Sequence, residues 1–363
     1  MTRFAAAAAA ALILVMFPLL ARAGEPPAAT RPASPEEAVY RADLQMLEIL
    51  LDEPSNDEIL DIGRHFRRRE DHARAAVFDL IALRGKPKDF LIEYELACNF
   101  ALWGQKKLAA KYLTLAADHG YWGYRVVVED TDLQSIKETP EFAAATKKIK
   151  ANFDVQAPKN PPGMTLATPQ GAPPPPNGWP VLVFLHGWAS ERSDFDEEAK
   201  FVTTLGYAGV TLDATQVMGP GAYTWDRKSV EPTHAQIQAA LKKLNAKIDP
   251  KRVYLQGFSQ GGMHAARLVA DHPESYRGAI CNSPGAEQLT PTALKDPKQT
   301  GPIILSFGEH DFDFVGGNVK KIEALWKSAG RPARVIIHPG GHALPPQHDE
   351  MFRDAIKQFN EGT

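Results

Sequence analysis

The chain has 363 residues and a formal net charge of −3 at pH 7. This length is long for a single hydrophobic core and natural for two domains. The densest basic run, residues 65–69, lies inside a helical pattern and is typical of a solvated helix face. Charge and composition therefore argue against a nucleic-acid partner.

The first residues have the pattern of a secretory signal peptide. A positive start at Arg3 precedes an uncharged apolar run over residues 4–20, and Ala21-Arg22-Ala23 fits an A-x-A cleavage site. The run is close to the roughly 20 residues that span a membrane, so a retained anchor is the alternative. We expect residues 1–23 to be removed and the mature protein to be secreted or periplasmic, with no membrane span.

A helical domain is predicted over residues 36–151, after a proline- and alanine-rich leader over 24–35 that we expect to be disordered. Small and aromatic residues recur in it at a spacing of 34 positions. The matched pairs are Gly63 and Ala97, Phe66 and Phe100, Ala75 and Ala109, Phe78 and Tyr112, and Ala82 and Ala116. Small residues let two antiparallel helices approach each other, and an aromatic fills the gap between them. On these residues the domain resembles tetratricopeptide repeats.

The repeat pattern covers two units, over about residues 57–120, and Ala143 continues it weakly toward a third. Residues 36–51 and 140–151 are expected to form flanking helices. The domain could bind a protein partner in a groove, or it could be a scaffold for the enzyme. The scaffold is slightly favoured, because two repeats offer little concave surface.

The only two cysteines of the chain, Cys98 and Cys281, fall in different predicted domains. We expect each to be a small buried apolar residue. A disulfide between them is the less favoured alternative.

A linker is predicted over residues 152–163 and a second domain over 164–363. In this domain apolar runs alternate with helical patterns, which predicts an α/β fold with a mostly parallel sheet covered on both faces. The expected strands are 181–185, 208–212, 253–257, 278–281, 303–307 and 334–338, with a further possible strand at 164–167. The expected helices are 194–205, 233–246, 260–272, 318–329 and 347–360.

The stretch Gly257-Phe-Ser-Gln-Gly261 lies between a strand and a helix, which is the context of a nucleophile elbow. Such a tight turn brings the backbone on either side of Ser259 close together, so it needs small residues two positions before and after the serine. The following helix directs its positive N-terminus at the reacting centre. Ser259 is therefore the predicted nucleophile.

A serine hydroxyl needs a base to take its proton, and α/β-hydrolases place the acid and then the histidine after the serine. Asp311, in the loop after the strand at 303–307, is the preferred acid. His342, which follows two glycines in a loop, is the predicted base. The alternatives are Asp313 and Glu309 for the acid, and His338 and His348 for the base.

Two backbone amides are expected to form an oxyanion hole. One belongs to Gln260, directly after the nucleophile, and the other to Trp188, in the loop after the first strand of the domain. His186 is expected to stabilise that loop. The indole of Trp188 is predicted to wall a substrate pocket that Trp225 also lines.

Four motifs together resemble the phospholipase/carboxylesterase group of α/β-hydrolases, which includes acyl-protein thioesterases. They are Phe184-Leu-His-Gly187, Gly257-Phe-Ser-Gln-Gly-Gly262, Gly308-Glu-His-Asp311 and Gly341-His342. The resemblance covers about residues 165–361. It implies the α/β-hydrolase fold and acyl transfer to water, with a small-molecule or lipid-like ester as substrate and no metal or organic cofactor.

The predicted function is therefore that of an exported serine esterase with a fairly open site, because the connection between the strands at 278–281 and 303–307 is too short for a large cap. Two alternatives remain. One is a serine peptidase of the prolyl-oligopeptidase type, and the other is a non-catalytic binding protein with a hydrolase-like scaffold.

Overall fold

The computed structural model describes residues 54–171, 173–244, 248–346 and 348–361. The predicted signal peptide, the leader and the flanking helix at 36–51 lie outside these residues. The chain divides into two compact units, one formed by residues up to 121 with 127–152 and the other by 122–126 with 153–363. Among the described residues, no helix is long and apolar enough to cross a membrane.

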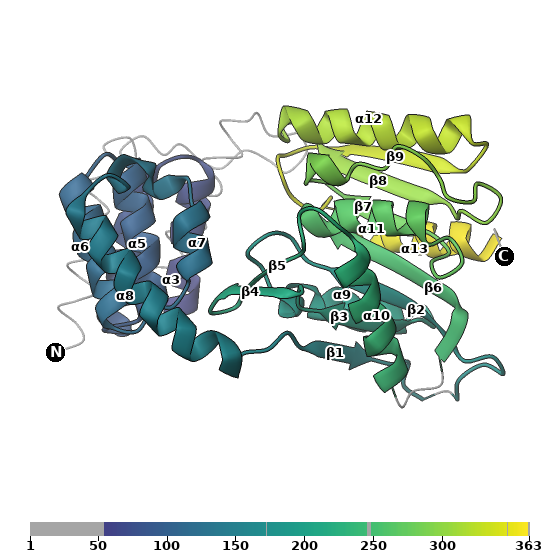
Figure 1. The fold of residues 1–363 in the computed structure, drawn as a ribbon, viewed down its shortest axis with the longest axis horizontal. Helices are drawn as coiled ribbons and strands as arrows, with labels where there is room; N and C mark the ends of the chain where they lie inside the picture. Colours follow the sequence, from purple (N-terminus) through teal and green to yellow (C-terminus); the bar gives the residue numbers. More distant parts are fainter. Residues whose placement is uncertain (1–53, 172, 245–247, 347, 362–363) are drawn as a thin grey trace, which may run out of the picture. The chain divides into compact units, whose positions relative to one another are not determined.

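The part of the chain before the sheet is helical (Figure 1). A capping box at Ser55 and Glu58 begins its first described helix, because the two residues satisfy each other's free backbone amides. The elements are α3 (Asn56–Arg68), α4 (His72–Gly85), α5 (Phe90–Leu102), α6 (Lys106–Asp118), α7 (Tyr124–Glu129), η1 (Asp132–Ile136), α8 (Pro140–Gln156) and η2 (Ala157–Lys159). Helix α8 extends five residues into the segment predicted as a linker, since the first proline there is Pro158.

Helices α3 and α4 pack together in the same way as α5 and α6. The rings of Phe66 and Phe78 stack with their centroids 5.4 Å apart, and those of Phe100 and Tyr112 stack at the same distance. The small residues of the 34-residue pattern are all buried: Gly63, Ala75, Ala82, Ala97, Ala109 and Ala116. Ala143, by contrast, is exposed, so the contacts that the first two units share do not extend to this position in α8.

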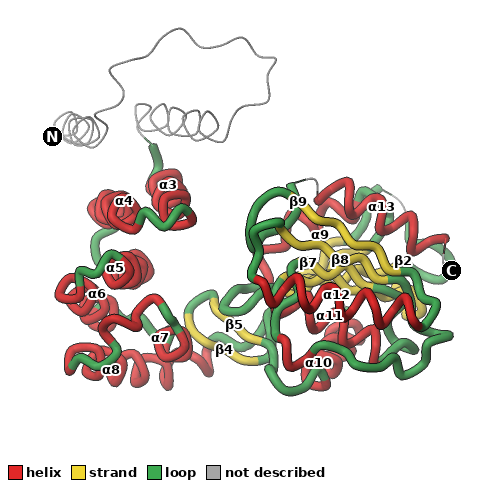
Figure 2. The backbone as a smooth tube through the Cα atoms, turned by 90° about the horizontal axis from the view of Figure 1, so that it is seen from above, coloured by secondary structure: helices red, strands yellow, loops and turns green. Residues whose placement is uncertain are grey.

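The second unit contains a seven-stranded sheet in the order β1-β3-β2-β6-β7-β8-β9, in which only β1 is antiparallel to its neighbour (Figures 1 and 2). The expected strands are all present. The strands are β1 (Met164–Ala167), β2 (Trp179–Leu185), β3 (Ala208–Leu212), β6 (Ile248–Phe258), β7 (Ala279–Asn282), β8 (Ile303–Gly308) and β9 (Ala333–His338). This is the α/β-hydrolase fold, as the sequence predicted.

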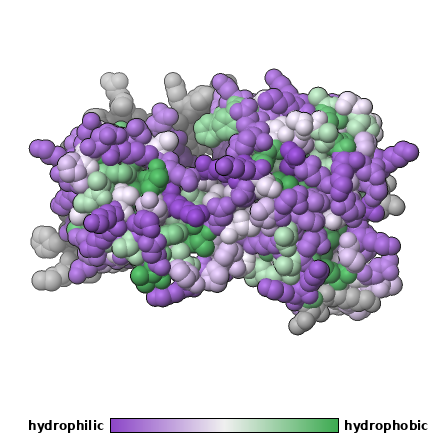
Figure 3. Space-filling view, viewed as in Figure 1, coloured by the Kyte–Doolittle hydropathy of each residue, from purple (hydrophilic) through white to green (hydrophobic). Residues whose placement is uncertain are grey.

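Helices cover both faces of the sheet, because alternate residues of each buried strand point to opposite sides. Val181, Val183 and Leu185 pack with α10 (Glu231–Lys243), α11 (Gln260–Asp271) and α12 (Asp313–Ser328). Leu182 and Phe184 pack with α9 (Asp196–Thr203) and α13 (His348–Glu361) on the other face. Hydrophilic side chains dominate the surface in Figure 3, as expected when the apolar residues fill these two cores.

In the second unit, the structure differs from the expected elements most clearly at a hairpin and at the start of one helix. A two-stranded hairpin, β4 (Gln216–Gly219) and β5 (Ala222–Thr224), lies between β3 and α10, where no element was expected. Helix α12 begins at Asp313 rather than at residue 318, although Gly316 and Gly317 lower its intrinsic helix propensity. Burial of Val315 and Val319 against the sheet outweighs that cost.

Both cysteines are buried and free, as expected. Cys98 lies in α5 and Cys281 in β7. Burial raises the pKa of the Cys281 thiol, which keeps it protonated and unreactive.

The matched aromatic contacts predict matched energetic costs for Phe66→Ala and Phe100→Ala. Each removes a buried ring from an equivalent stack, so each should destabilise the helical unit by about 3–5 kcal/mol, with the two within about 1 kcal/mol of each other. Denaturant unfolding followed by circular dichroism measures both. Leu102→Ala, at an exposed position, is the control and should cost under about 0.5 kcal/mol. A large difference between the two phenylalanine variants would contradict the equivalence.

Candidate active site

Ser259 occupies a strained turn between β6 and α11. Its backbone angles are φ 52° and ψ −116°, a conformation that side-chain-bearing residues rarely adopt. The surrounding backbone holds it there. The Ser259 amide donates to the Asn282 carbonyl at 2.9 Å, and the Ser259 carbonyl accepts from the amides of Gly285 at 2.8 Å and Met263 at 3.1 Å. The side chain is thereby presented at the C-terminal edge of the sheet.

The turn requires glycine at two positions because neither has room for a side chain. A Cβ atom on Gly257 would lie 2.2 Å from the Gly261 carbonyl oxygen, and one on Gly261 would lie 2.1 Å from the Leu185 carbonyl oxygen. Both obstacles are backbone atoms, which cannot move aside as a flexible side chain can. The structure thus supplies the steric reason for the spacing that the sequence shows.

The loops after β8 and β9 bring Asp311 and His342 together. Strand pairing places Gly308 opposite His338, and the amides of Glu309 and His310 then donate to the carbonyls of His338 and Gly340 at 2.9 and 2.8 Å. These contacts tie the beginnings of the two loops to each other. Residues 31 positions apart in the sequence therefore meet at one edge of the sheet.

His342 lies between Ser259 and Asp311. Its Nδ1 is 2.8 Å from Asp311 Oδ1 and its Nε2 is 2.9 Å from Ser259 Oγ. Because a carboxylate can only accept, Nδ1 carries the proton and Nε2 is left to accept from the serine hydroxyl. The Asp311 side chain is 1% exposed and that of His342 is 23% exposed, so the acid is enclosed while the base stays accessible.

The alternative acids and bases lie elsewhere. Asp313 begins α12 with an exposed side chain, and Glu309 is exposed as well. His338 is buried at the end of β9, and His348 begins α13, 3.9 Å from a Glu198 oxygen. In the described structure only His342 joins Ser259 to a carboxylate by hydrogen bonds.

The segments of the two predicted oxyanion donors both adjoin the serine. Gln260 is the first residue of α11, and its side chain is held by bonds to Thr224 Oγ1 at 3.0 Å and to the Trp225 amide at 3.2 Å. The loop after β2 passes close by, since a Cβ on Gly187 would lie 3.5 Å from Ser259 Cβ. Trp188, next in that loop, lines the same cavity as Ser259.

His186 holds this loop in place through the hydrogen bonds of its imidazole ring. Its Nε2 accepts from the Ala214 amide at 2.9 Å, so the proton is on Nδ1, which faces the Gly187 carbonyl at 2.6 Å. Burial lowers the pKa of His186 and favours this neutral form. The role expected for His186 fits these contacts.

Trp225 does not line the cavity, contrary to the prediction. It is fully buried, and its indole Nε1 donates to the His186 carbonyl at 2.8 Å. Trp225 directly follows β5, at the point where the chain enters the core. A buried indole packs favourably there because its N–H has a hydrogen-bond partner. Trp225 therefore supports the loop that contains Trp188.

An open cavity of about 530 Å³ lies over Ser259 and His342. Its walls are mostly apolar, and its lining residues are Gly187, Trp188, Ser190, Asp194, Phe195, Phe258, Ser259, Phe312, His342 and Leu344. Phe312 is 56% exposed and stacks on Phe314 with ring centroids 5.5 Å apart. Sequence reasoning missed Phe258 and Phe312, although each directly adjoins a predicted catalytic residue.

Comparisons with known proteins agree with the fold. Residues 180–348 match the family model described as the alpha/beta hydrolase fold. A Nocardia uniformis subsp. tsuyamanensis protein named "Putative esterase NocK" is 30% identical over 45% of this chain and 50% of its own length. An Arabidopsis thaliana protein named "Probable carboxylesterase SOBER1-like" is 28% identical over 36% of this chain and 50% of its own length. The chain thus spans about half the length of these curated relatives.

Among solved structures, the carboxylesterase of Bacillus cereus aligns with 58% of this chain and 98% of its own, at 15% identity and a TM-score of 0.44.

The steric role of the elbow glycines predicts that Gly261→Ala destabilises the second unit by several kcal/mol, about 3 or more, because the new methyl group would overlap the Leu185 carbonyl. Gly317→Ala in α12 is the matched control. No atom lies within 4 Å of its new Cβ, so it should be neutral or stabilising by up to about 1 kcal/mol. Thermal unfolding compares the two, and equal melting temperatures would contradict the steric argument.

Proposed function

We propose that the chain is a serine hydrolase that cleaves carboxylic esters through an acyl-enzyme. The observation that carries this proposal is the continuous hydrogen-bonded chain from Ser259 Oγ through His342 to Asp311. The names of the curated relatives, an esterase and a carboxylesterase, support the same chemistry.

In the first half of the reaction, Ser259 Oγ attacks the ester carbonyl carbon while His342 Nε2 takes the hydroxyl proton. The tetrahedral intermediate collapses by breaking the bond to the alkoxy oxygen, and His342 returns the proton to the departing alcohol. Water then attacks the acyl-enzyme by the same proton transfers and releases the acid. Asp311 holds the imidazole in the required tautomer and stabilises the imidazolium that forms.

The backbone amides of Trp188 and Gln260 are proposed to bind the oxyanion. Each donor of this kind stabilises the transition state by about 3 kcal/mol. The position of Gln260 at the N-terminus of α11 adds the positive end of the helix dipole. The buried bonds of the Gln260 side chain fix that residue in place before substrate binds.

The cavity favours esters with an accessible apolar group. Trp188, Phe258 and Phe312 present aromatic surface beside the nucleophile. Residues 283–302, between β7 and β8, contain only the three-residue helix η4 (Glu287–Leu289), so no cap domain arises from this connection. We propose small-molecule or lipid-like acyl esters as substrates.

Ser259→Ala should lower kcat/KM for p-nitrophenyl esters by at least about 10⁴-fold, because no other described group is bonded to His342 as a nucleophile. Asp311→Asn should cost on the order of 10³- to 10⁴-fold, since the amide favours the wrong tautomer of His342. Initial rates on a panel of acyl chain lengths, with peptide p-nitroanilides as the amide arm, measure both effects.

Asp313→Asn and His310→Gln are the matched controls, since both side chains are exposed and lie beside the triad. They should stay within about twofold of wild type. Full activity of Ser259→Ala would reject the nucleophile. Absence of ester hydrolysis by wild type, together with no labelling of Ser259 by a phosphonate, would reject the enzyme.

We further propose that the protein is exported, on the strength of the apolar run over residues 4–20 and the Ala21-Arg22-Ala23 motif. Cell fractionation after expression of the full chain should place a product that begins near Gly24 outside the cytoplasm. Recovery of the uncut chain in the cytoplasm would contradict export, and an uncut membrane-bound chain would indicate a retained anchor.

The helical unit is proposed to be tetratricopeptide-like and to act as a scaffold. The repeated stacks of Phe66 on Phe78 and of Phe100 on Tyr112 support two repeats, and the paired alanine variants of Phe66 and Phe100 described above test their equivalence.

A further inference from the structure

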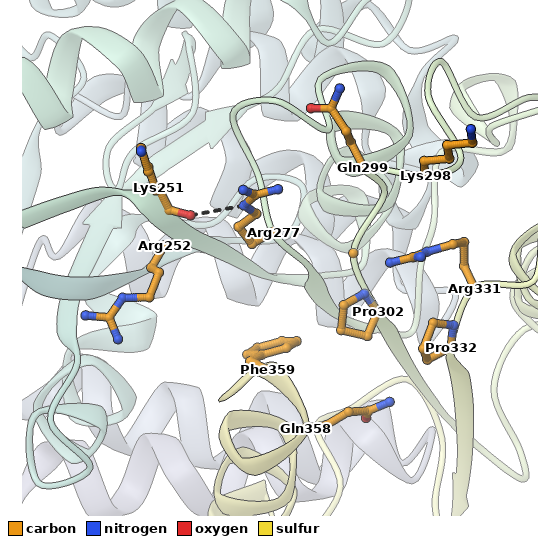
Figure 4. Close-up of a pocket in the computed structure, with 11 residues that line it drawn as sticks. Lys251, Arg252, Arg277, Lys298, Gln299, Pro302, Arg331, Pro332, Gln358 and Phe359 are labelled. Atoms are coloured by element: carbon orange, nitrogen blue, oxygen red, sulfur yellow. Dashed lines mark hydrogen bonds between the residues drawn. The ribbon is translucent and has the colours of Figure 1, made fainter. Parts of the chain in front are cut away.

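A second cavity, of about 580 Å³, lies at the edge of the sheet opposite Ser259 (Figure 4). The parallel strands β6 to β9 begin at this edge, and Ser259 follows the far end of β6. At about 3.3 Å per residue, the strand from Lys251 to Phe258 separates the two sites by roughly 23 Å. The second cavity is thus distinct from the proposed active site.

The lining of this cavity is strongly basic. It contains five cationic side chains and no carboxylate, in a chain whose formal charge is −3. The cations come from the first half of β6 and from the segments that precede β7, β8 and β9, namely Lys251, Arg252, Arg277, Lys298 and Arg331. Parallel pairing therefore gathers charges that are up to 80 positions apart in the sequence.

Most of this charge is not neutralised inside the protein. Arg252 is paired, with its Nε 2.8 Å from Asp249 Oδ2, and Lys298 lies near the Asp296 carboxylate. In the part of the chain that the structure describes, Lys251, Arg277 and Arg331 form no ion pair with a carboxylate. Like charges that are held close together repel each other. An anion that binds between them relieves this repulsion, so its binding is electrostatically favourable.

The arginines are held in positions that suit a phosphate-like group. Arg277 Nε donates to the Lys251 carbonyl at 3.1 Å, which leaves the two terminal nitrogens of its guanidinium for a ligand. Arg331 extends toward Arg277 in Figure 4, and its Nε is buried without a hydrogen-bond partner. Guanidinium groups match the geometry of phosphate and sulfate oxygens better than ammonium groups do.

Apolar surface lies beside the cations. The ring of Phe359, from α13, and the rings of Pro302 and Pro332 line the same cavity. A cavity of this volume accommodates a small organic molecule. We propose that it binds a multiply charged phosphate- or sulfate-type anion attached to an apolar or planar group, with Arg277 and Arg331 as the main anion ligands.

Titration of the full chain with inorganic pyrophosphate at constant ionic strength, by isothermal calorimetry, tests the site. Wild type should bind saturably, and added salt should weaken the binding. Arg277→Gln/Arg331→Gln should bind about tenfold more weakly or worse, since charged hydrogen bonds are lost. Lys242→Gln/Lys243→Gln removes the same charge from exposed positions of α10 and should bind like wild type.

A second double variant controls for misfolding of the first, because Arg277 also donates a hydrogen bond to the Lys251 backbone carbonyl. Lys251→Gln/Arg331→Gln leaves that bond in place and should weaken binding in the same direction. Ester hydrolysis should be unchanged in both double variants, so failure of this site is distinguishable from failure of the proposed enzyme. Undiminished pyrophosphate binding by the two double variants would overturn the proposal.

The source of the anion is distinguished by co-sedimentation with phosphatidic acid vesicles, whose phosphomonoester headgroup has two ionisable oxygens, with phosphatidylcholine vesicles as the control without net charge. Vesicle binding that pyrophosphate displaces and that the double variants lose identifies a lipid headgroup. Pyrophosphate binding without vesicle binding identifies a free anion. Binding of neither probe by wild type would overturn the site.

Discussion

The close approach of three backbone segments around Ser259 is the constraint on which the proposed active site depends. The turn needs a residue with positive φ at its apex and no side chain at Gly257 and Gly261, because carbonyl oxygens occupy the space. Hydrogen bonds from Gly285 and to Asn282 hold this strained backbone in place. The serine hydroxyl is therefore oriented before any substrate binds. The entropy lost in positioning it is already offset by folding, so it does not add to the activation free energy of the reaction.

The parallel sheet converts this local turn into a complete site. Ser259, Asp311 and His342 each follow a different strand, and parallel strands end at one edge. The pairing of β8 with β9 extends into hydrogen bonds between their loops, which fixes the distance from Asp311 to His342. Two buried side chains that do not contact Ser259 by hydrogen bonds hold the neighbouring loop in place. His186 joins the loop after β2 to Ala214, and Trp225 bonds to the His186 carbonyl.

The same topology gives the two edges of the sheet different chemistry. At the C-terminal edge, Ser259 and His342 line a cavity with aromatic walls, and the neutral His186 supports the neighbouring loop. At the N-terminal edge, basic residues within or just before the strands line a cavity whose lining includes no carboxylate. Two apolar cores cover the two faces of the sheet between these edges. An anion bound at one edge would therefore be well separated from a reaction at the other edge.

The sequence by itself determined the order of the seven strands of the main sheet along the chain, the elbow around Ser259, the aspartate and the histidine that meet it, and the 34-residue spacing of Phe66 and Phe100. These features depend on local periodicity, on steric needs within a few residues and on chain order. Only the tertiary structure decided that Trp225 is core, that Ala143 is exposed, that Phe258 and Phe312 line the cavity, and that Arg277 and Arg331 converge. The environment of such a side chain is set by segments that are distant in sequence and adjacent only after the sheet has formed.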